Sequence, residues 1–446
     1  MSGHGVDRVD RGLGQARGGA KGNTKPPPQT AAKAGRSPLA HARLRGGAPR
    51  CTFKRVSAQV SFRVLDSISD AGSAPWDALL APDATPFVRY HWLAALEESG
   101  CAGPRNGWTP QHLTLWRGAR LIAAAPAYLK EDSDGDFARD WDFASAAQQA
   151  RLRYFPKLAL TVPLTPCTGS RLLVAPGEDR AALVRQLLQG AEALAREQRW
   201  GSLQVLFPNE AEAGELELAG WAVRVSSQFH WYNRGYQDLD DFLSRLNSKK
   251  RSMLRREMAQ PAKDGLTIRT VREPALRAEP KRWAKTIHSL HAHTVDQLMW
   301  GRRWLNQGFY DRIFATMPDA LEAVVAEKGG EVIAGAFKVA SATRLYGRYW
   351  GSFEQHPFLH FNVCYYHSLS ECIARGTRVF EGGAGGEHKL PRGFEPSITY
   401  AAHRCLDARL ESSLRRHLAE ETPARAASIA RFREEAGVYK KVQEQT

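Results

Sequence analysis

The sequence predicts an α/β protein made of two tandem copies of one unit, with mixed sheets flanked by helices. Residues 117–126 and 328–337 share one pattern, a tight turn followed by a strand of small and branched residues. Each half then offers a helix followed by a strand. These pairs are 181–198 with 202–207, and 361–374 with 377–380. An order repeated at such long spacing favours a duplicated α/β unit over a solenoid, whose period would be far shorter.

The boundary between the two units is expected near Tyr236. Residues 59–235 form the first predicted domain, and residues 236–446 form the second, which ends in helices. The first unit carries a long insertion at about residues 131–171. Apolar spacing places the elements of the second unit. Helices are expected at 238–256, 280–293 and 307–317, strands at 320–327, 331–341 and 344–351, and surface helices at 408–420 and 423–436.

The positive charge is unevenly distributed along the chain. Of the formal net charge of +15, residues 1–58 hold +10, which leaves +5 for residues 59–446. Residues 1–58 are poor in large apolar side chains, so they are predicted to be a disordered basic tail. They lack the continuous apolar segment of a secretory signal, and both a transit peptide and a mis-assigned start stay open.

Hydropathy and the spacing of the cysteines indicate the cellular compartment of the protein. No apolar run approaches the roughly 18 residues that a membrane helix needs, so no membrane span is expected. The six cysteines lie far apart without a CxxC pair, which favours reduced core thiols in a cytoplasmic protein. His288 and His291 share a helical face near Asp296, but no further ligand stands at a supporting spacing, so no metal is expected.

The most informative stretch is Phe380-Glu-Gly-Gly-Ala-Gly-Gly-Glu-His-Lys-Leu-Pro-Arg-Gly-Phe394. An apolar strand end turns into a glycine-rich loop, whose glycines allow positive φ and close approach of a ligand to the main chain. Four ionisable side chains follow the glycines, namely Glu387, His388, Lys389 and Arg392. They can supply a base, an acid and an anion clamp at a strand end, where α/β sites tend to form.

This stretch and the run His356-Pro-Phe-Leu-His-Phe-Asn-Val-Cys-Tyr-Tyr366 resemble the FemAB-like predicted N-acyltransferases. Supporting matches are Tyr154-Phe-Pro-Lys157, Pro163-Leu-Thr-Pro-Cys-Thr-Gly169 and Leu246-Asn-Ser-Lys-Lys-Arg251. The order turn, strand, strand, helix, strand in the second unit is also that of a GNAT-type core. The resemblance implies two tandem GNAT-like (acyl-CoA N-acyltransferase-like) domains and leaves the substrate open. The broader Fem group transfers aminoacyl groups from tRNA to peptidoglycan precursors.

Direct attack by an amine sets the expected roles of the catalytic residues. The amine must be neutral, so Glu387 or His388 is expected to remove its proton, directly or through water. Tyr349, Lys389 or Arg392 can provide a proton or a cation to the leaving group. Backbone N–H groups near Tyr349 can stabilise the oxyanion. No nucleophile elbow or Cys–His signature argues for a covalent enzyme intermediate.

The expected binding residues form a donor group and an acceptor group. The donor group is Gly383, Gly385, Gly386, Arg392, Lys249, Lys250 and Arg251. The acceptor group is Arg348, Trp350, His360 and Tyr365. No tightly bound cofactor is expected, and acyl-CoA or aminoacyl-tRNA serves as co-substrate. The acceptor is expected to be a small molecule or a peptidoglycan-type amine.

Two features point to different donors. Coenzyme A enzymes of GNAT type commonly hold pyrophosphate on a glycine-rich turn before a helix, whereas residues 352–360 contain a proline and no glycine. This counts against acetyl-CoA. The segment Lys249–Arg256 carries five cations, a good surface for the phosphates of tRNA, although such a helix face is often simply solvated and balanced by nearby acids.

Two other interpretations stay open. A non-catalytic protein on the same fold would recognise a peptidoglycan precursor or a peptide, so loss of the charged residues after the glycine-rich loop would weaken binding with no turnover to lose. An RNA-binding protein would use the basic tail and the Lys249–Arg256 helix. Its steep salt dependence would survive loss of the glycine-rich loop.

Overall fold

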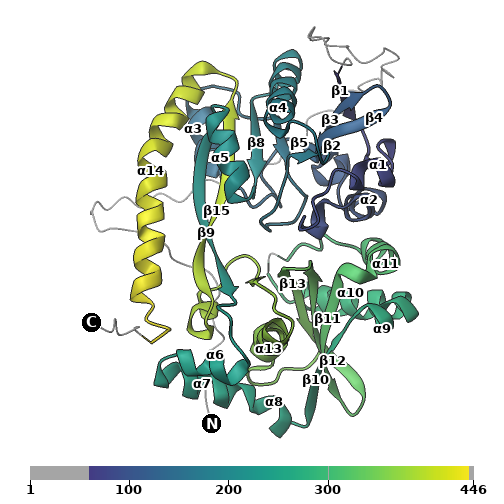
Figure 1. Ribbon diagram of the computed structural model, residues 1–446, viewed down its shortest axis with the longest axis vertical. Helices are drawn as coiled ribbons and strands as arrows, with labels where there is room; N and C mark the ends of the chain where they lie inside the picture. The colour runs from purple at the N-terminus through teal and green to yellow at the C-terminus, as the bar shows by residue number, and fades with distance from the viewer. Residues whose placement is uncertain (1–59, 300, 441–446) are drawn as a thin grey trace. The chain divides into compact units, whose positions relative to one another are not determined.

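Two β-sheets organise residues 60–299 and 301–440, the part of the chain that this computed structural model describes (Figure 1). The smaller sheet has four strands in the order β1-β3-β4-β7. The larger sheet has eleven, in the order β10-β11-β12-β13-β14-β9-β15-β8-β6-β5-β2. Its pairs β13–β14 and β6–β8 are parallel, and the others are antiparallel. The predicted α/β class, with mixed sheets flanked by helices, is confirmed. The predicted tail, residues 1–58, lies outside the described residues.

The strands range from two to eleven residues in length. They are β1 Val60–Leu65, β2 Thr109–Pro110, β3 His112–Arg117, β4 Arg120–Ala125, β5 Ala127–Lys130, β6 Lys157–Leu160, β7 Leu173–Val174, β8 Ser202–Leu206, β9 Ala222–Tyr232, β10 Leu266–Val271, β11 Leu321–Lys328, β12 Glu331–Ala340, β13 Arg344–Ser352, β14 Val379–Glu381 and β15 Glu395–Cys405. The three strands predicted at 320–327, 331–341 and 344–351 are therefore confirmed as β11, β12 and β13.

Helices flank the sheets. They are α1 Ser73–Asp77, α2 Tyr90–Glu98, α3 Trp141–Gln149, α4 Arg180–Glu197, α5 Glu210–Leu218, α6 Leu239–Arg245, α7 Ser248–Met258, α8 Gln260–Lys263, α9 Glu273–Ala278, α10 Pro280–Asp296, α11 Gln307–Thr316, α12 Leu359–Phe361, α13 His367–Ala374 and α14 Ala408–Glu435. None of these helices has both the length and the apolar character that crossing a membrane requires. The helices predicted at 181–198, 280–293 and 307–317 are confirmed as α4, α10 and α11.

The single helix predicted over 238–256 is wrong, because the chain breaks it into α6 and α7. Leu246 takes an extended conformation, with ψ of 154°, and ends α6. The side chain of Asn247 then accepts a hydrogen bond from the N–H of Lys250, which caps the start of α7. Helix α7 therefore starts anew after the break, and the cations after Asn247 do not continue the helix that carries the apolar stripe of α6.

The two helices predicted at 408–420 and 423–436 form one continuous helix, α14. Pro423 lies inside it, and the helix runs on to Glu435. A proline removes one backbone donor and usually bends or ends a helix. Here α14 packs along β9 and β15, so tertiary packing outweighs the local cost of the proline (Figure 1).

The helix predicted at 361–374 is present but irregular. It starts at Leu359 and contains a π-turn, Asn362–Tyr366, before α13. In the π-turn the N–H of His367 donates to the carbonyl of Asn362, five residues earlier. Such turns rotate the following side chains relative to an α-helix and occur often at functional sites.

Strands β9 and β15, which the sequence patterns did not reveal, connect the two halves in one sheet. They pair antiparallel from Ala222 with His403 to His230 with Glu395. Strand β15 also pairs with β8, so a strand from beyond Tyr236 lies between two strands from before it. The division of the chain at 235/236 into separate domains stays a prediction.

The aromatic core also crosses from the first half of the chain to the second. The ring of Phe87 meets that of Tyr346 edge-on, with centroids 5.0 Å apart, and Trp92 meets Phe309 at 5.2 Å. All four side chains are fully or almost fully buried. Edge-to-face pairs of this kind contribute about 1 kcal/mol each beyond their burial, so the elements around β13 are held by both halves.

Candidate functional site

The candidate site begins where the parallel pairing of β13 and β14 ends. The two strands pair only from Arg344 with Val379 to Tyr346 with Glu381, whereas β13 continues to Ser352. Among the described residues, no strand pairs with this side of β13 beyond Tyr346. We call the stretch 347–352 the open edge of β13. Its main-chain groups on that side are available to an extended ligand.

A β-bulge in β13 sets the direction of two predicted site residues, Arg348 and Tyr349. The register against β12 shifts at Phe337, and Arg348 is the extra residue. The two side chains then lie together, with Arg348 Nη2 3.3 Å from the Tyr349 hydroxyl. The Tyr349 ring packs against His291 of α10 in a tilted arrangement, with centroids 4.1 Å apart. Burial raises the pKa of Tyr349, so its hydroxyl stays protonated and can donate.

Arg348 reaches the first half of the chain. Its Nη2 donates to the carbonyl of Leu164 at 2.5 Å, and its Nη1 lies 3.5 Å from Cys167 Sγ. One of the motifs that carry the family resemblance, Pro163–Gly169, therefore meets the strand around Arg348 at the site. The guanidinium predicted to bind the acceptor is already engaged in holding this segment.

The other predicted acceptor residues gather on the opposite side of β13. Trp350 packs against His360 with ring centroids 5.2 Å apart, and the Tyr365 hydroxyl lies 3.1 Å from His388 Nε2. Burial and the neighbouring cations lower the pKa of His388 to about 4 and that of His360 to about 3. Both imidazoles are therefore neutral near pH 7. The structure thus brings Trp350, His360, Tyr365 and the catalytic candidate His388 into one aromatic cluster.

The glycine-rich loop Gly382–Gly386 follows β14 directly. Gly383, Gly385 and Gly386 all take φ between +69° and +86°, where a side chain would be strained. Lys389 is buried beneath the loop, and its Nζ donates to the carbonyls of Gly383 at 2.8 Å and Gly385 at 2.5 Å. Burial lowers its pKa to about 8. Lys389 therefore shapes the loop from inside, while Glu387 at the end of the loop is exposed.

Arg392 closes the 3₁₀ turn Glu387–Arg392 that follows the loop. Its Nη2 pairs with Glu257 of α7 at 2.7 Å, and its Nη1 donates to the carbonyl of His388 at 2.5 Å. The guanidinium also lies 3.3 Å from the ring centroid of Phe361. Tyr366 donates to the same Glu257 carboxylate. Arg392, predicted to bind the donor, is thus buried and connects the 3₁₀ turn, the π-turn segment and α7.

Helix α7 carries the predicted phosphate-binding cations Lys249, Lys250 and Arg251. Lys249 is exposed, and the other two are half-buried. Among the described residues none of the three forms an ion pair, whereas Arg255 pairs with Asp240 at 2.9 Å. Because Glu257 ties the inner side of α7 to Arg392, this basic surface is anchored next to the glycine-rich loop.

Glu381 is a site residue that the sequence reasoning missed. It ends β14 and is almost fully buried, with its Oε1 3.0 Å from Arg344 Nη1 and its Oε2 accepting the N–H of Thr168 at 3.2 Å. Its Oε2 is also 3.8 Å from His230 Nε2. Burial raises the pKa of Glu381 to about 7, against the opposing pull of Arg344. A carboxylate between an apolar strand end and a glycine pair was the signal in the sequence.

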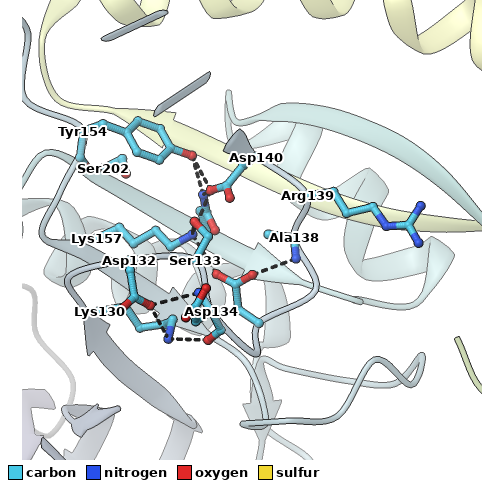
Figure 2. Close-up of polar contacts among 12 residues, drawn as sticks. Lys130, Asp132, Ser133, Asp134, Ala138, Arg139, Asp140, Tyr154, Lys157 and Ser202 are labelled. Carbon is cyan, nitrogen blue, oxygen red and sulfur yellow. Dashed lines mark hydrogen bonds and ion pairs between the residues drawn. The ribbon is translucent and has the colours of Figure 1, made fainter. Parts of the chain in front are cut away.

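The Tyr154–Lys157 motif forms a buried ionic cluster in the first half (Figure 2). Lys157 Nζ lies 2.7 Å from the carboxylates of Asp136 and Asp140 and donates to Ser133 Oγ at 2.7 Å. The Tyr154 hydroxyl donates to Asp140 at 2.6 Å. All of these side chains are buried, so the motif stabilises the insertion between β5 and β6.

His291, one of the histidines considered for a metal, has another partner. The His291 ring forms a hydrogen bond with the Tyr310 hydroxyl at 2.9 Å. In the described part of the chain, one group, Asp142, His417 and Glu421, brings three potential metal ligands together. Arg224 already pairs with both carboxylates of that group, at 2.8 and 2.9 Å, so it is a salt-bridge cluster. The five described cysteines are free and buried.

Comparison with known proteins identifies one family. The sequence model of the FemAB-like family, described as peptidoglycan biosynthesis/recognition, matches residues 67–441. No curated protein matches the chain. Similar solved structures include a tandem GNAT protein from the clavulanic acid biosynthesis pathway, at 16% identity, 78% coverage of this chain, 98% of that chain and a TM-score of 0.40. FemX is 10% identical, with 78% of this chain and 98% of FemX covered and a TM-score of 0.47. L-PGS from Bacillus licheniformis is 11% identical, with 72% of this chain and 94% of that chain covered and a TM-score of 0.41.

Proposed function

The chain belongs to the FemAB-like family, and on that premise we propose that it is an N-acyltransferase. It moves an acyl or aminoacyl group from an activated donor to an amine by direct attack. The family description, peptidoglycan biosynthesis/recognition, supports a peptidoglycan-type amine as the acceptor.

The observation that carries this proposal is the open edge of β13 beside the glycine-rich loop. Residues 347–352 present main-chain groups with no neighbouring strand in the described part of the chain, and the loop starts at Gly382, one residue after β14 ends. An extended donor can lie along this edge in the manner of an added strand. Its reacting carbonyl then sits beside N–H groups that can stabilise an oxyanion.

The reaction needs one bond made, one bond broken and two proton movements. The amine nitrogen attacks the acyl carbon, and the bond to the donor oxygen or sulfur breaks as the tetrahedral intermediate collapses. Glu387, exposed at the end of the loop, takes the amine proton directly or through water. Tyr349, protonated because burial raises its pKa, gives a proton to the leaving group. The neutral imidazole of His388 orients the amine by accepting a hydrogen bond.

Two donor classes fit the surroundings. Acyl-CoA and aminoacyl-tRNA both carry phosphates. The cations Lys249, Lys250 and Arg251 of α7 lie next to the loop, because Glu257 of the same helix pairs with Arg392. An RNA donor engages Lys249 and Lys250 through several phosphates and therefore depends steeply on salt. A coenzyme A donor places fewer charges on this helix and depends on it less.

The test is a transfer assay with the full chain. Acetyl-CoA, or tRNA charged with a mixture of amino acids, is incubated with a peptidoglycan stem peptide that bears a free amine, and product is read as added mass on the peptide. Transfer from either donor supports the proposal. The double variant Lys249→Ala/Lys250→Ala is expected to reduce transfer from tRNA at least tenfold and from acetyl-CoA less than twofold. Saturable peptide binding without transfer from any donor would instead identify a recognition protein.

A further inference from the structure

The buried lysines of the molecule differ in how their charge is balanced. Among the described residues they are Lys130, Lys157, Lys338 and Lys389. In the first half, Lys157 Nζ lies 2.7 Å from both Asp136 and Asp140, and Lys130 Nζ lies 3.6 Å from Asp132. In the second half, neither buried lysine forms an ion pair within the described ranges. Burying an ammonium group without an opposite charge costs several kcal/mol, so these two charges require an explanation.

Lys338 lies in β12 and points into the π-turn. Its Nζ donates to the carbonyls of Cys364 at 2.8 Å and Val363 at 3.3 Å, and to the Ser368 hydroxyl. It also lies 5.1 Å from the ring centroid of Phe380, the residue before Glu381 in β14. All of these partners are neutral. Burial lowers the pKa of Lys338 to about 8, and the side chain remains a cation at pH 7.

Lys389 repeats this arrangement beneath the glycine-rich loop. Its partners are the carbonyls of Gly383, Ala384 and Gly385, which are also neutral. The positive field of both lysines reaches the same neighbours, since each contributes to the lowered pKa of His360 and to the opposing pull on the pKa of Cys364. Both ammonium groups also lie near the end of β14 that leads into the loop, because Lys338 Nζ is 5.1 Å from the ring centroid of Phe380 and Lys389 Nζ donates to the loop carbonyls.

The loop turns its donors away from Lys389. A trans peptide unit is planar and its N–H points opposite to its C=O. Because the carbonyls of Gly383, Ala384 and Gly385 face inward, the N–H groups of Ala384, Gly385 and Gly386 face outward. These three N–H groups find no acceptor among the described residues. Consecutive outward N–H groups around glycines of positive φ form a concave anion-binding surface.

We propose that the outward face of the glycine-rich loop binds a phosphate group of the donor, and that Lys338 and Lys389 supply the balancing charge from behind. Both lysines act through their charge, and Lys389 also shapes the loop through its hydrogen bonds to the carbonyls of Gly383 and Gly385. Arg392 adds no net charge, because Glu257 already neutralises it at 2.7 Å. The phosphate can be the pyrophosphate of a coenzyme or the phosphodiester of an RNA 3′ end. The assignment to the donor rests on the proposed transferase function, but phosphate binding itself can be measured without turnover.

The test is a calorimetric titration of inorganic pyrophosphate into the full chain at low salt. Saturable binding is expected, with the dissociation constant raised at least tenfold in Lys338→Met and in Lys389→Met. Lys285→Met, which removes an exposed cation from α10, is the matched control and should change the constant less than twofold. Thermal unfolding verifies that each variant is folded, and Lys389→Met decides alone if Lys338→Met does not fold.

Three results would overturn the proposal. They are no saturable pyrophosphate binding, an affinity that neither lysine variant lowers, and an affinity that falls in Lys249→Ala/Lys250→Ala while both buried-lysine variants bind normally.

Competition then identifies the source of the phosphate, because either coenzyme A or a short RNA should displace pyrophosphate. Displacement by neither would remove the link to a donor. Pyrophosphate binding without any transfer would count against the transferase function alone, and transfer without pyrophosphate binding would count against this site alone.

Discussion

The two halves of the chain contain the same parallel strand pair and end it differently. In the first half β6 and β8 pair from Lys157 with Ser202 to Leu160 with Val205. Beyond this pair the chain folds back, and the fully buried guanidinium of Arg171 donates to the carbonyls of Leu206 at 3.0 Å and Cys167 at 2.6 Å. In the second half β13 continues to Ser352 paired with β12, and on its other side no described strand pairs with it beyond Tyr346. In the first half the side chain of Arg171 thus occupies the end of the strand pair. In the second half the edge of β13 beyond Tyr346 has no described strand beside it and can receive a ligand.

The buried lysines of the two halves also differ, in whether an acidic side chain balances their charge. The first half balances its buried Lys157 with two aspartates, whereas the second half buries Lys338 and Lys389 without an acid in the described residues. A protein that binds an anion needs a positive site before the anion arrives, and it carries the cost in the unliganded state. The buried lysines are therefore balanced by acids in the first half and not in the second, although the fully buried Arg171 of the first half also donates only to neutral carbonyls.

The largest expected effect is a difference in stability between two lysine variants. Lys157→Met leaves Asp136 and Asp140 buried without a cation, and we expect a loss of about 3–5 kcal/mol in the free energy of unfolding. Lys338→Met removes an unbalanced charge, and we expect a change within about 1 kcal/mol or a gain, because lost hydrogen bonds and relieved desolvation oppose each other. Urea unfolding at pH 7 measures both.

The exposed Lys285→Met provides the baseline for this pair, since surface substitutions usually stay within about 0.5 kcal/mol. Equal losses in Lys157→Met and Lys338→Met would contradict the comparison. They would mean that Lys338 contributes to stability as much as a lysine held between two carboxylates.

A second prediction breaks the closure of the first half. Arg171→Met leaves the carbonyls of Leu206 and Cys167 without donors in a buried position, and we expect a loss of about 3 kcal/mol. The exposed Arg277→Met, whose guanidinium pairs only with Glu273 at 2.6 Å among the described residues, should lose less than about 1 kcal/mol. A loss in Arg171→Met no greater than in this control would show that the closure is not held by Arg171.

Periodicity predicted the regular elements of this fold well and the connections between them poorly. The strands β11–β13 and the helices α10 and α11 follow their apolar spacing. The sheet that joins the halves depends on β9 and β15, whose partners lie far away in the sequence, and no local pattern specifies such pairing. The helix break at Asn247 was visible as a capping residue, but the apolar stripe before it dominated the prediction.

The candidate site was predicted in its loop and missed in its electrostatics. Glycine density located the loop, and the structure brings Trp350, His360, Tyr365 and His388 together as one cluster. Whether a charge is balanced cannot be deduced from sequence, because it depends on neighbours across strands. A single lysine in the apolar strand 331–341 was the available signal for Lys338, and a single glutamate after Phe380 was the signal for Glu381.

A third prediction concerns the open edge of β13. Tyr349→Phe keeps the packing against His291 and removes the hydroxyl that donates to the leaving group, so we expect transfer to fall about 10–100-fold in kcat. The free energy of unfolding should change by less than about 1 kcal/mol. Tyr90→Phe, a half-buried tyrosine on α2, is the control for loss of a hydroxyl elsewhere. Full activity in Tyr349→Phe would assign the proton to another group.

A fourth prediction is a pH dependence of stability that belongs to Glu381, the carboxyl beneath the site. Its pKa of about 7 in the folded chain lies above the ordinary value of 4.5. Folding therefore gains stability from the protonated form below pH about 4.5, and this gain is lost as the pH rises through 7. The slope is at most about 1.4 kcal/mol per pH unit, since one proton is involved.

Buried histidines oppose this slope in the same pH window, so the readout must be a difference between two proteins. His230 and His360 have pKa values lowered to about 3, and His403 to about 4, so their stability contributions rise with pH up to about 6.5. Glu381→Gln removes one titration and leaves those of His360 and His403, whereas His230, 3.8 Å from Glu381, titrates together with it. The free energy of unfolding of the wild type minus that of the variant should fall steadily between pH 4.5 and 7. A flat difference would place the folded-state pKa of Glu381 at its ordinary value, and the buried carboxylate would then be ionised and fully balanced by Arg344.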